Sequence, residues 1–508
     1  MDILTSIVTA ILVLFTTFAA LASKIYIGKS IGSKKYPPVV GTVFRQLFHV
    51  NTFYDFLSEM AKTQPTFRFL GPEHSIIYTA NPANIEHILK TNFHLYTIGS
   101  GNGEQVSSDL FGQGIFTVDG EKWKQQRKLA AAEFSTRVLR DFSCEVFRRN
   151  AAKLAQMVSE ISQANQVFDL QELLMRCTLD SIFKVGFGVD LNCLQGTVQE
   201  ANEFMKAFDD SNEIVFRRHI DPLWKLKRYL QIGCEANLRN NIKVIHSFVD
   251  SLIKTRRRLL HTKQDINEKE DILSRFLVES RKDPENMSDE YLRDIILNFM
   301  IAGKDTSAST LSWFFYMLCK NLWIQEKIAG EIDEVLGTER TDLSIDDFVA
   351  SITDEVFEKM HYTHATLTET LRLFPAVPLN GRRACADDIL PDGFQVKKGD
   401  GVNYMPYPMG RMPYVWEDDA REFRPERWLQ DGRFQPESPF KFVSFHAGPR
   451  LCIGKDFAYR QMKTIAIALV RFFQFRLKDE AQELTYRTMF TLHIKDGLRI
   501  QAIPRSKA

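Results

Sequence analysis

The chain has 508 residues, 44% of them hydrophobic, and its 65 lysines and arginines almost balance its 64 aspartates and glutamates, for a net charge of +1. This length allows one large domain with appended segments, and the balanced charge argues against nucleic acid as a partner. The seven cysteines contain no CxxC pair, which argues against a disulfide framework and against a structural zinc site.

The first predicted element is an uncharged run over residues 3–22, which is long enough to cross a bilayer as a helix. Lysines at 24, 29, 34 and 35 follow it, so the positive-inside rule places the rest of the chain in the cytosol. A cleaved secretory signal is the alternative, because Ala20-Leu21-Ala22 resembles a cleavage site. The run is long for a signal, however, and no basic residue precedes it.

These observations divide the chain into three parts. We predict a transmembrane anchor over residues 1–23 and a basic hinge with two adjacent prolines over residues 24–42. One large domain then fills residues 43–508. The arrangement predicts a single-pass protein in contact with membrane lipid.

The large domain is predicted to be mainly α with a minor β part. Apolar residues recur at three- and four-residue spacing in four long stretches, which predicts helices over 121–160, 167–187, 235–260 and 289–320. Strand-like runs are few, and the clearest are Ser75 to Thr79 and Met489 to Ile494. The charged stretch 261–271 is predicted to be a solvated loop.

Two helical stretches carry polar residues at notable spacing. In GEKWKQQRK, Trp123 and Arg127 lie four residues apart and share one helix face. In the middle of the helix predicted over 289–320, Ala302-Gly303-Lys304-Asp305-Thr306-Ser307 interrupts strongly apolar flanks. A glycine and a hydroxyl at mid-helix can bend the backbone, so this segment is a candidate site and not an ordinary solvated face.

A third pattern lies further along the chain. Glu369 and Arg372 in LTETLRLFP share a helix face, and FRPERW follows at 423–428 with Arg427. An exposed ion pair would be the ordinary interpretation.

The most specific pattern is FHAGPRLCIG at 445–454, in which Phe445, Gly448, Arg450, Cys452 and Gly454 fit FxxGxRxCxG. The glycines permit close backbone approach, and amides turned toward the sulfur would stabilise a thiolate. Arg450 suits a carboxylate. These features fit Cys452 as a metal ligand on a flat macrocycle, although a lone cysteine is most often a small buried hydrophobe.

Together these motifs resemble, in order, those of the cytochrome P-450 superfamily of haem-thiolate monooxygenases. The resemblance implies the family fold, a haem b cofactor with Cys452 as the axial ligand of its iron, and a loop shaped by Phe445, Gly448 and Gly454. Arg450, Trp123, Arg127 and, as a third propionate partner, Arg382 would hold the haem. Asp305 and Thr306 would deliver protons for cleavage of the O–O bond of dioxygen. Glu369, Arg372 and Arg427 would form a buried network that holds the haem side of the site, a network that fixes geometry more than it adds stability. Lys304 and Ser307 depart from the arginine and threonine usual in plant members.

Within the superfamily, residues 111–135 and the block YPMGRM at 407–412 resemble plant long-chain fatty-acid ω-hydroxylases. Hydroxylation of a terminal methyl group demands a narrow pocket, because its C–H bond is stronger than those of the methylenes beside it. The resemblance implies a pocket lined by Leu110, Phe111, Phe299, Ala302, Val377, Leu379, Phe490 and Leu492. Arg217 and Arg218 are candidate partners for the fatty-acid carboxylate.

The chain carries no nicotinamide or flavin fingerprint, because Gly99-Ser100-Gly101-Asn102-Gly103 has the wrong spacing for a dinucleotide loop. The resemblance therefore implies an NADPH-dependent reductase as electron donor and residence in the endoplasmic reticulum membrane. A basic docking face for that reductase could consist of Lys122, Lys124, Lys128, Lys455 and Arg460.

Three alternatives remain open. A monooxygenase of sterols or terpenoids would use the same chemistry on another lipid. A haem-thiolate isomerase of lipid hydroperoxides would not need Asp305 and Thr306. A haem sensor on a membrane would not need an apolar channel.

Overall fold

The computed structural model is mainly helical with a minor β part, as the sequence predicts. The structure describes residues 3–99, 103–134, 137–196, 199–221, 223–262, 271–282, 284–285, 287–337 and 343–505.

The helices range from one turn to 32 residues. They are α1 (Ile3–Tyr26), α2 (Phe53–Thr63), α3 (Pro82–Glu86), α4 (Gly103–Phe111), α5 (Gly120–Phe134), α6 (Arg137–Gln163), α7 (Leu170–Phe187), α8 (Gln199–Arg217), α9 (Trp224–Leu230), α10 (Cys234–Thr262), α11 (Ile272–Lys282), α12 (Asp289–Lys320), α13 (Leu322–Leu336), α14 (Ile345–Ala350), α15 (Asp354–Lys359), α16 (His361–Leu373), α17 (Pro406–Met409), α18 (Pro413–Trp416) and α19 (Lys455–Phe472).

The largest sheet has six strands in the order β1-β2-β3-β9-β6-β4 and mixes parallel and antiparallel pairs. Its strands are β1 (Val39–Thr42), β2 (Thr66–Leu70), β3 (Ser75–Thr79), β4 (Tyr96–Thr97), β6 (Asn380–Ala384) and β9 (Gly401–Tyr404). A three-stranded sheet contains β5 (Val167–Asp169), β12 (Phe473–Leu477) and β13 (Arg499–Pro504). Two short hairpins pair β7 (Asp388–Ile389) with β8 (Gln395–Val396) and β10 (Leu429–Gln430) with β11 (Arg433–Phe434).

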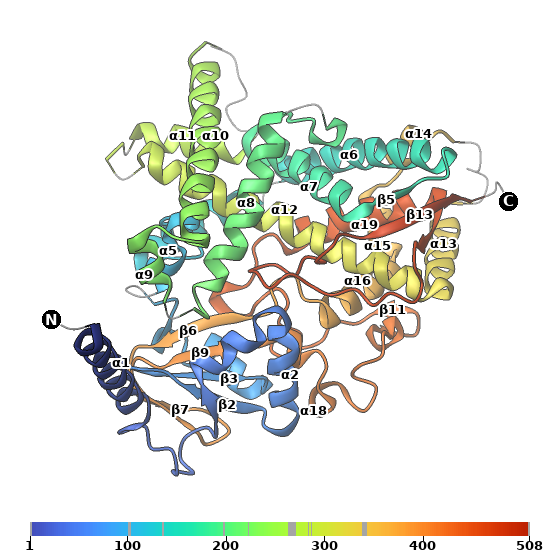
Figure 1. Ribbon diagram of the computed structural model, residues 1–508. Coiled ribbons are helices and arrows are strands. Elements are labelled where there is room, and N and C mark those ends of the chain that lie inside the picture. Colours follow the sequence, from blue (N-terminus) through green and yellow to red (C-terminus); the bar gives the residue numbers. More distant parts are fainter. Residues whose placement is uncertain are drawn as a thin grey trace.

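The six-stranded sheet lies at one side of the molecule, and the long helices fill the other (Figure 1). Helix α12 passes through the middle of the helical part, with most of its residues buried. It begins at a serine cap, where the Ser288 hydroxyl accepts a hydrogen bond from the amide of Tyr291. Acidic residues Asp289 and Glu290 occupy its first turn and Lys320 its last, which suits the helix dipole.

The long helices follow the predictions with some corrections. The helix predicted over 289–320 is confirmed as α12, and the one over 235–260 as α10. The stretch 121–160 forms two helices, α5 and α6, and the stretch 167–187 begins with strand β5, which pairs with β13. Of the loop predicted over 261–271, residues 263–270 lie outside the described residues.

Of the two predicted strands, Ser75 to Thr79 is confirmed as β3, whereas the strand over Met489 to Ile494 is wrong. In that segment the amide of Leu492 donates to the carbonyl of Ala376, and the amide of Phe490 donates to the side chain of Asn212. The alternation of apolar residues there reflects burial against helices, not pairing in a sheet.

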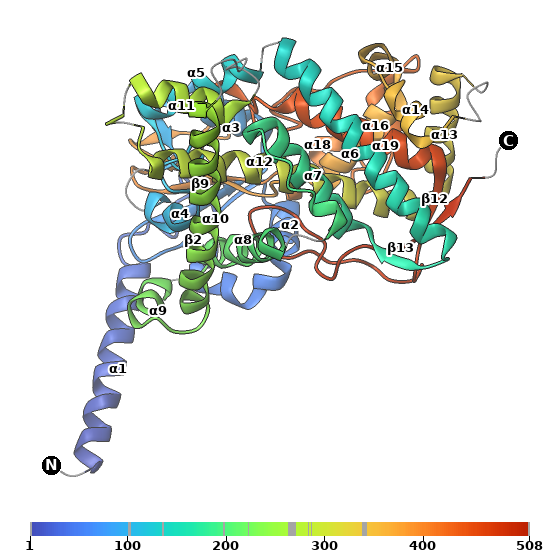
Figure 2. The same cartoon turned by 90° about the horizontal axis from the view of Figure 1, so that it is seen from above.

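The N-terminal run forms helix α1, which projects from the body of the molecule (Figure 2). Leu12, Val13 and Phe15 are exposed on it, with Phe15 70% exposed. Among the residues that the structure describes, no helix meets the length and hydropathy needed to cross a membrane. The membrane anchor over residues 1–23 therefore stays a prediction.

Candidate functional site

A cavity of about 830 Å³ lies between α12 and the loop that carries Cys452. Cys452 lines it from one side, and Phe299, Ala302, Gly303 and Thr306 of α12 line it from another. The sequence motifs at 302–307 and 445–454 are thus brought to the same cavity.

The Cys452 loop is held by its own backbone and by its neighbours. Gly448 has a φ of +63°, and a Cβ there would lie 1.9 Å from the carbonyl oxygen of Leu89, so only glycine fits. The amide of Cys452 donates to the carbonyl of Phe445 at 2.9 Å. At Gly454 a Cβ would lie 4.0 Å from the Cys452 sulfur, which is ordinary contact.

The sulfur of Cys452 sits just before the N-terminus of α19. Burial raises the pKa of the Cys452 thiol, while the Gly454 amide and the Arg127 guanidinium oppose this rise. A helix N-terminus and a nearby cation both favour a thiolate. The loop thus offers a sulfur that a metal ion could take as a thiolate ligand.

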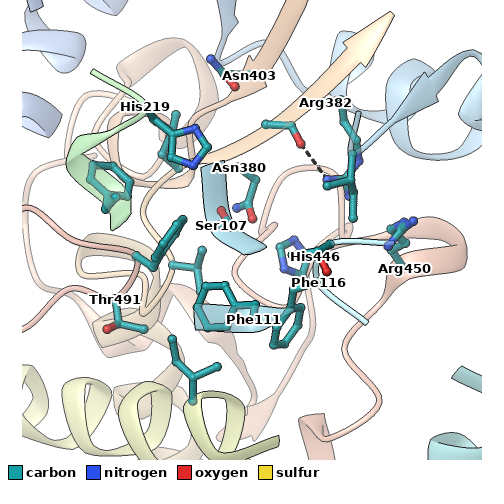
Figure 3. A pocket seen from close by; sticks show the side chains of 18 of the residues that line it. Ser107, Phe111, Phe116, His219, Asn380, Arg382, Asn403, His446, Arg450 and Thr491 are labelled. Carbon is teal, nitrogen blue, oxygen red and sulfur yellow. Dashed lines mark hydrogen bonds between the residues drawn. The ribbon is translucent and has the colours of Figure 1, made fainter. Parts of the chain in front are cut away.

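Arginines gather beside this loop in a cationic cluster of Arg127, Arg382 and Arg450, of which Arg382 is buried and the other two are half-buried. Arg382 and Arg450 lie at one side of the cavity together with His446 (Figure 3). Burial, with Arg382 beside it, lowers the pKa of Arg450 to about 10 even though Asp119 pairs with it at 2.7 Å. Burial and the same three arginines lower the pKa of His446 to about 3.

The cationic cluster has more positive charge than its protein partners balance. Asp119 is engaged by Arg450 and by the amides of Ile98 and Gly99. Within the described residues, Nε of Arg382 is buried and has no hydrogen-bond partner. Trp123 packs under Arg450, with the guanidinium carbon 4.4 Å from the ring centroid. The cluster is therefore suited to an anionic ligand.

Comparison with known proteins agrees with this geometry. The family model for Cytochrome P450 matches residues 34–499. The chain belongs to the cytochrome P450 family. It is 48% identical over 514 residues to Cytochrome P450 704C1 of Pinus taeda. The aligned region covers 97% of this chain and 98% of that relative. It is 44% identical to Cytochrome P450 704B1 of Arabidopsis thaliana, over 92% of this chain and 94% of that relative. It is 39% identical to Cytochrome P450 86B1 of the same plant, over 89% of this chain and 82% of that relative.

Cytochromes P450 bind haem b through a cysteine thiolate. The residues present fit this cofactor, because Cys452 and the cationic cluster line one cavity and the cluster can pair with two propionates. Of the predicted haem-binding residues, Trp123, Arg127, Arg382, Phe445, Arg450 and Gly454 line the cavity, while Gly448 packs against the backbone of Leu89. Arg127 also donates to the carbonyl of Leu451 at 2.7 Å, which ties α5 to the Cys452 loop.

The structure brings Glu369, Arg372 and Arg427 together in one buried network of this P450. The Glu369 carboxylate accepts two hydrogen bonds of 2.8 Å from Arg372 and one of 3.1 Å from Arg427. The indole of Trp428 and the backbone amide of Arg424 also donate to it, which the sequence motifs did not indicate. Arg372 in turn binds the carbonyls of Ala420 and Glu422.

The predicted substrate pocket divides into two groups. Six residues line the cavity: Phe111, Phe299, Ala302, Val377, Leu379 and Phe490. Leu110 and Leu492 are fully buried in the hydrophobic core and are absent from the cavity wall, so their assignment to the pocket is corrected. The Leu492 carbonyl instead accepts a hydrogen bond from the Trp313 indole.

The two arginines proposed for a substrate carboxylate are already paired. Arg218 is buried and binds both oxygens of Glu235, at 2.8 and 2.6 Å, and Asp109 at 2.6 Å. Arg217 is partly exposed and pairs with Glu213. Arg218 lines the cavity, but two carboxylates already occupy its guanidinium, and Glu213 occupies that of Arg217. A fatty-acid carboxylate would have to displace one of these partners.

Thr306 lines the cavity, and its hydroxyl donates to the carbonyl of Ala302 at 2.6 Å. Asp305 is fully buried and lies outside the cavity wall. Its carboxylate is 2.7 Å from the ammonium of Lys304, which also pairs with Asp209 at 2.6 Å. The two residues predicted to deliver protons therefore do not face the same space.

Several cavity residues carried no sequence signal. His219, Asn380 and Ser107 are polar groups on the cavity wall (Figure 3). Burial and the neighbouring Arg218 lower the pKa of His219 to about 4, so its ring is neutral at physiological pH. These residues come from three separate elements and fit no motif, so only the fold could reveal them.

Proposed function

We propose that this P450 hydroxylates long-chain fatty acids at the terminal carbon. One oxygen atom of O₂ enters the product and the other leaves as water, with two electrons from an NADPH-dependent reductase and two protons from solvent. Haem b bound to Cys452 would supply the activation of O₂. The observation that carries the proposal is the apolar, aromatic wall of the cavity beside Cys452.

Aromatic rings pack against one another along that wall. The ring of Phe490 lies 5.5 Å from that of Phe111, 5.3 Å from that of Phe216 and 5.8 Å from that of His219. Phe299 stacks with Phe134 at 6.1 Å on the α12 side. An apolar wall of aromatic rings supports the binding of an alkyl chain, which would enter end-on.

One of the two stretches that resemble fatty-acid ω-hydroxylases takes part in this wall. Phe111, Phe116, Trp123 and Phe134, all within 111–135, line the cavity. The block 407–412 instead packs beside α2, where the Tyr407 hydroxyl donates to Asp55 at 2.9 Å. Support for the substrate class thus comes from the first stretch.

The electron donor would bind near the Cys452 loop. Lys122, Lys124 and Lys128 are exposed on α5, and Lys455 is exposed in the first turn of α19. Both helices adjoin that loop. Arg460 is half-buried and pairs with Asp354, so it contributes less to such a surface. We propose this lysine face as the reductase docking site.

We also propose that α1 attaches the protein to the endoplasmic reticulum membrane with the catalytic domain in the cytosol. The uncharged run at 3–22 and the exposed apolar side chains of α1 support this. Carbonate washing of membranes from expressing cells tests it: the full chain should stay with the membrane and a chain lacking residues 1–26 should be released. Release of both would refute attachment through α1.

The substrate proposal is tested by titrating a saturated C16 or C18 fatty acid into the purified protein and recording the Soret band. A shift from the low-spin to the high-spin position is expected, because an apolar ligand excludes water from the haem. Product analysis should then show the ω-hydroxy acid. A stable haem band that no fatty acid shifts, but that sterols or terpenoids do, would refute the fatty-acid proposal and support the alternative monooxygenase.

A further inference from the structure

A cluster of buried polar side chains lies between α12, α8 and the segment that follows β12. We call it the His493 cluster; it consists of Asn212, Lys304, Asp305, Thr491 and His493. Each of these residues is at most 3% exposed. Five polar side chains buried together in an otherwise apolar region need a specific reason, because burial of such groups is costly unless they are paired.

The cluster reaches the cavity at one point. Thr491 lines the cavity wall, where Figure 3 shows it beside the aromatic side chains. Its hydroxyl oxygen is 3.2 Å from Nε2 of His493, and the same nitrogen is 3.9 Å from a carboxylate oxygen of Asp305. The Asn212 amide donates to that Asp305 oxygen at 3.2 Å and to the Thr491 hydroxyl at 3.4 Å. Asn212 thereby links the carboxylate to the hydroxyl, and both lie near Nε2 of His493.

At its other end the cluster approaches solvent. Lys304 is fully buried between Asp305 and Asp209, and the Asp209 side chain is 23% exposed. Burial alone would lower the pKa of Lys304, but the two carboxylates outweigh it and raise the pKa. Lys304 is therefore charged at physiological pH, and its ammonium balances the negative charge of Asp305. Asp305 itself does not line the cavity.

Charges of both signs face His493. Burial lowers its pKa, Asp305 and Asp209 oppose this, and Lys304 on α12 and Arg487 on its own segment add to the lowering. The imidazole is thus neutral near pH 7, and a proton placed on Nε2 would be stabilised by the Asp305 carboxylate and could be donated to Thr491. An imidazole nitrogen that lies near both a cavity-wall hydroxyl and a buried carboxylate has the geometry that proton transfer needs.

We propose that His493 and Thr491 pass protons into the cavity, and that Asp305 and Asn212 are positioning residues that orient this pair. His493, neutral at rest, first takes up a proton from the Asp209 side of the cluster. The proton on Nε2 then moves to the Thr491 oxygen while the Thr491 hydroxyl proton moves to an acceptor in the cavity, and His493 returns to its neutral form. The step involves protons only, and two such transfers match the two protons that monooxygenation consumes.

The test compares His493→Gln and Thr491→Val with matched controls in the full-length, haem-loaded protein. Thr488→Val removes a buried hydroxyl from the same segment whose oxygen has no partner among the described residues. His87→Gln replaces a histidine that pairs with Asp388 near the hairpin β7-β8, away from the cavity. Haem content and the dissociation constant of a bound substrate are measured first. Both should stay at wild-type values, because His493 and Thr491 are proposed to transfer protons and not to bind haem or substrate.

The product formed per NADPH, the peroxide released and the solvent isotope effect on turnover are then compared. In both test variants we expect product formation to fall about tenfold or more, with more peroxide and a larger solvent isotope effect, because general acid-base residues contribute at least that much. The controls should keep the wild-type values. The proposal would be overturned if both test variants kept the wild-type product yield per NADPH and the wild-type isotope effect. It would also be overturned if Thr491→Val and Thr488→Val lost product formation to the same extent.

The inference rests on monooxygenase chemistry and not on the lipid substrate. Any compound that the protein hydroxylates can serve in the test. Peroxide release and NADPH use can also be measured in a protein that no fatty acid shifts, so failure of the substrate proposal and failure of the His493 proposal give different results. If His493→Gln loses haem, Thr491→Val, at the cavity wall, still decides the outcome.

Discussion

The two sides of the cytochrome P450 site differ in how completely their polar groups are paired. On the Cys452 side, both oxygens of Glu369 are occupied by donors from Arg372, Arg427, Trp428 and the Arg424 backbone. On the cavity side, Nε of Arg382 and Nδ2 of Asn380 are buried without partners in the part of the chain that the structure describes. The first region is complete without a ligand, whereas the second is built to receive one.

The largest effect is expected where the pairing is complete. Glu369→Gln removes the charge that balances Arg372 and Arg427 in a fully buried site, which costs about 3–5 kcal/mol of stability. We expect little or no haem to be incorporated, as measured by Soret absorbance per mole of protein and by thermal unfolding.

Glu326→Gln is a suitable control, because Glu326 pairs with Arg505 where its side chain is 48% exposed. Loss of such a pair costs at most about 1 kcal/mol. A fully haem-loaded Glu369→Gln protein with unchanged thermal unfolding would contradict the comparison of the two regions.

Local patterns explain why this first region could be predicted. Glu369 and Arg372 share a helix face by their three-residue spacing, and the Gly448 turn follows from a glycine inside a recognisable loop. The Trp428 and Arg424 contacts depend on how a distant loop returns to α16, so no local pattern predicted them. The mainly α fold and helix α12 followed from periodicity for the same local reason.

The second region was predicted less well because its contacts are long-range. Leu110 and Leu492 have the apolar character of pocket residues, but sequence cannot tell whether a buried leucine faces a cavity or the core. Asn212 contacts Asp305 across 93 positions of the chain and Thr491 across 279. The alternation at Met489 to Ile494 resembles a strand, yet this segment carries Thr491 to the cavity wall and His493 to the buried cluster.

The next largest effect tests the loop that joins the two regions. Gly448→Ala places a Cβ 1.9 Å from the Leu89 carbonyl oxygen, so the Cys452 loop must move. We expect a large loss of haem content and a clear fall in the melting temperature. Gly432→Ala is the matched control, because Gly432 also has positive φ (+74°) but has open space around its Cβ.

The control separates backbone strain from steric conflict. Gly432→Ala should lose about 1–2 kcal/mol from the left-handed backbone alone and keep its haem. Equal haem loss in both variants would show that the close approach to Leu89 is unimportant. Haem retention in Gly448→Ala would show that the loop adapts.

A smaller effect separates the cavity wall from the core. Phe299→Ala widens the cavity beside α12, so we expect hydroxylation to spread from the terminal carbon to neighbouring positions. Leu110→Ala leaves a cavity in the core and should lower stability by about 2–5 kcal/mol while the product pattern is kept. Gas chromatography of the hydroxy acids and thermal unfolding measure the two effects. An unchanged product pattern in Phe299→Ala would remove the main support for end-on binding.

The smallest effect concerns the exposed surface beside the Cys452 loop. Lys455 is exposed, and its ammonium lies 5.7 Å from the Phe445 ring centroid. Lys455→Glu should raise the apparent KM for the reductase several-fold at low ionic strength, because rim charges mainly steer association. The difference from wild type should shrink as salt is added, since screening acts over about 10 Å at 0.1 M. Lys62→Glu, on α2, is the charge-matched control, because Lys62 is exposed and pairs with the exposed Glu59. A salt-independent change in KM, or an equal change in both variants, would argue that Lys455 acts through the structure of the loop and not through docking.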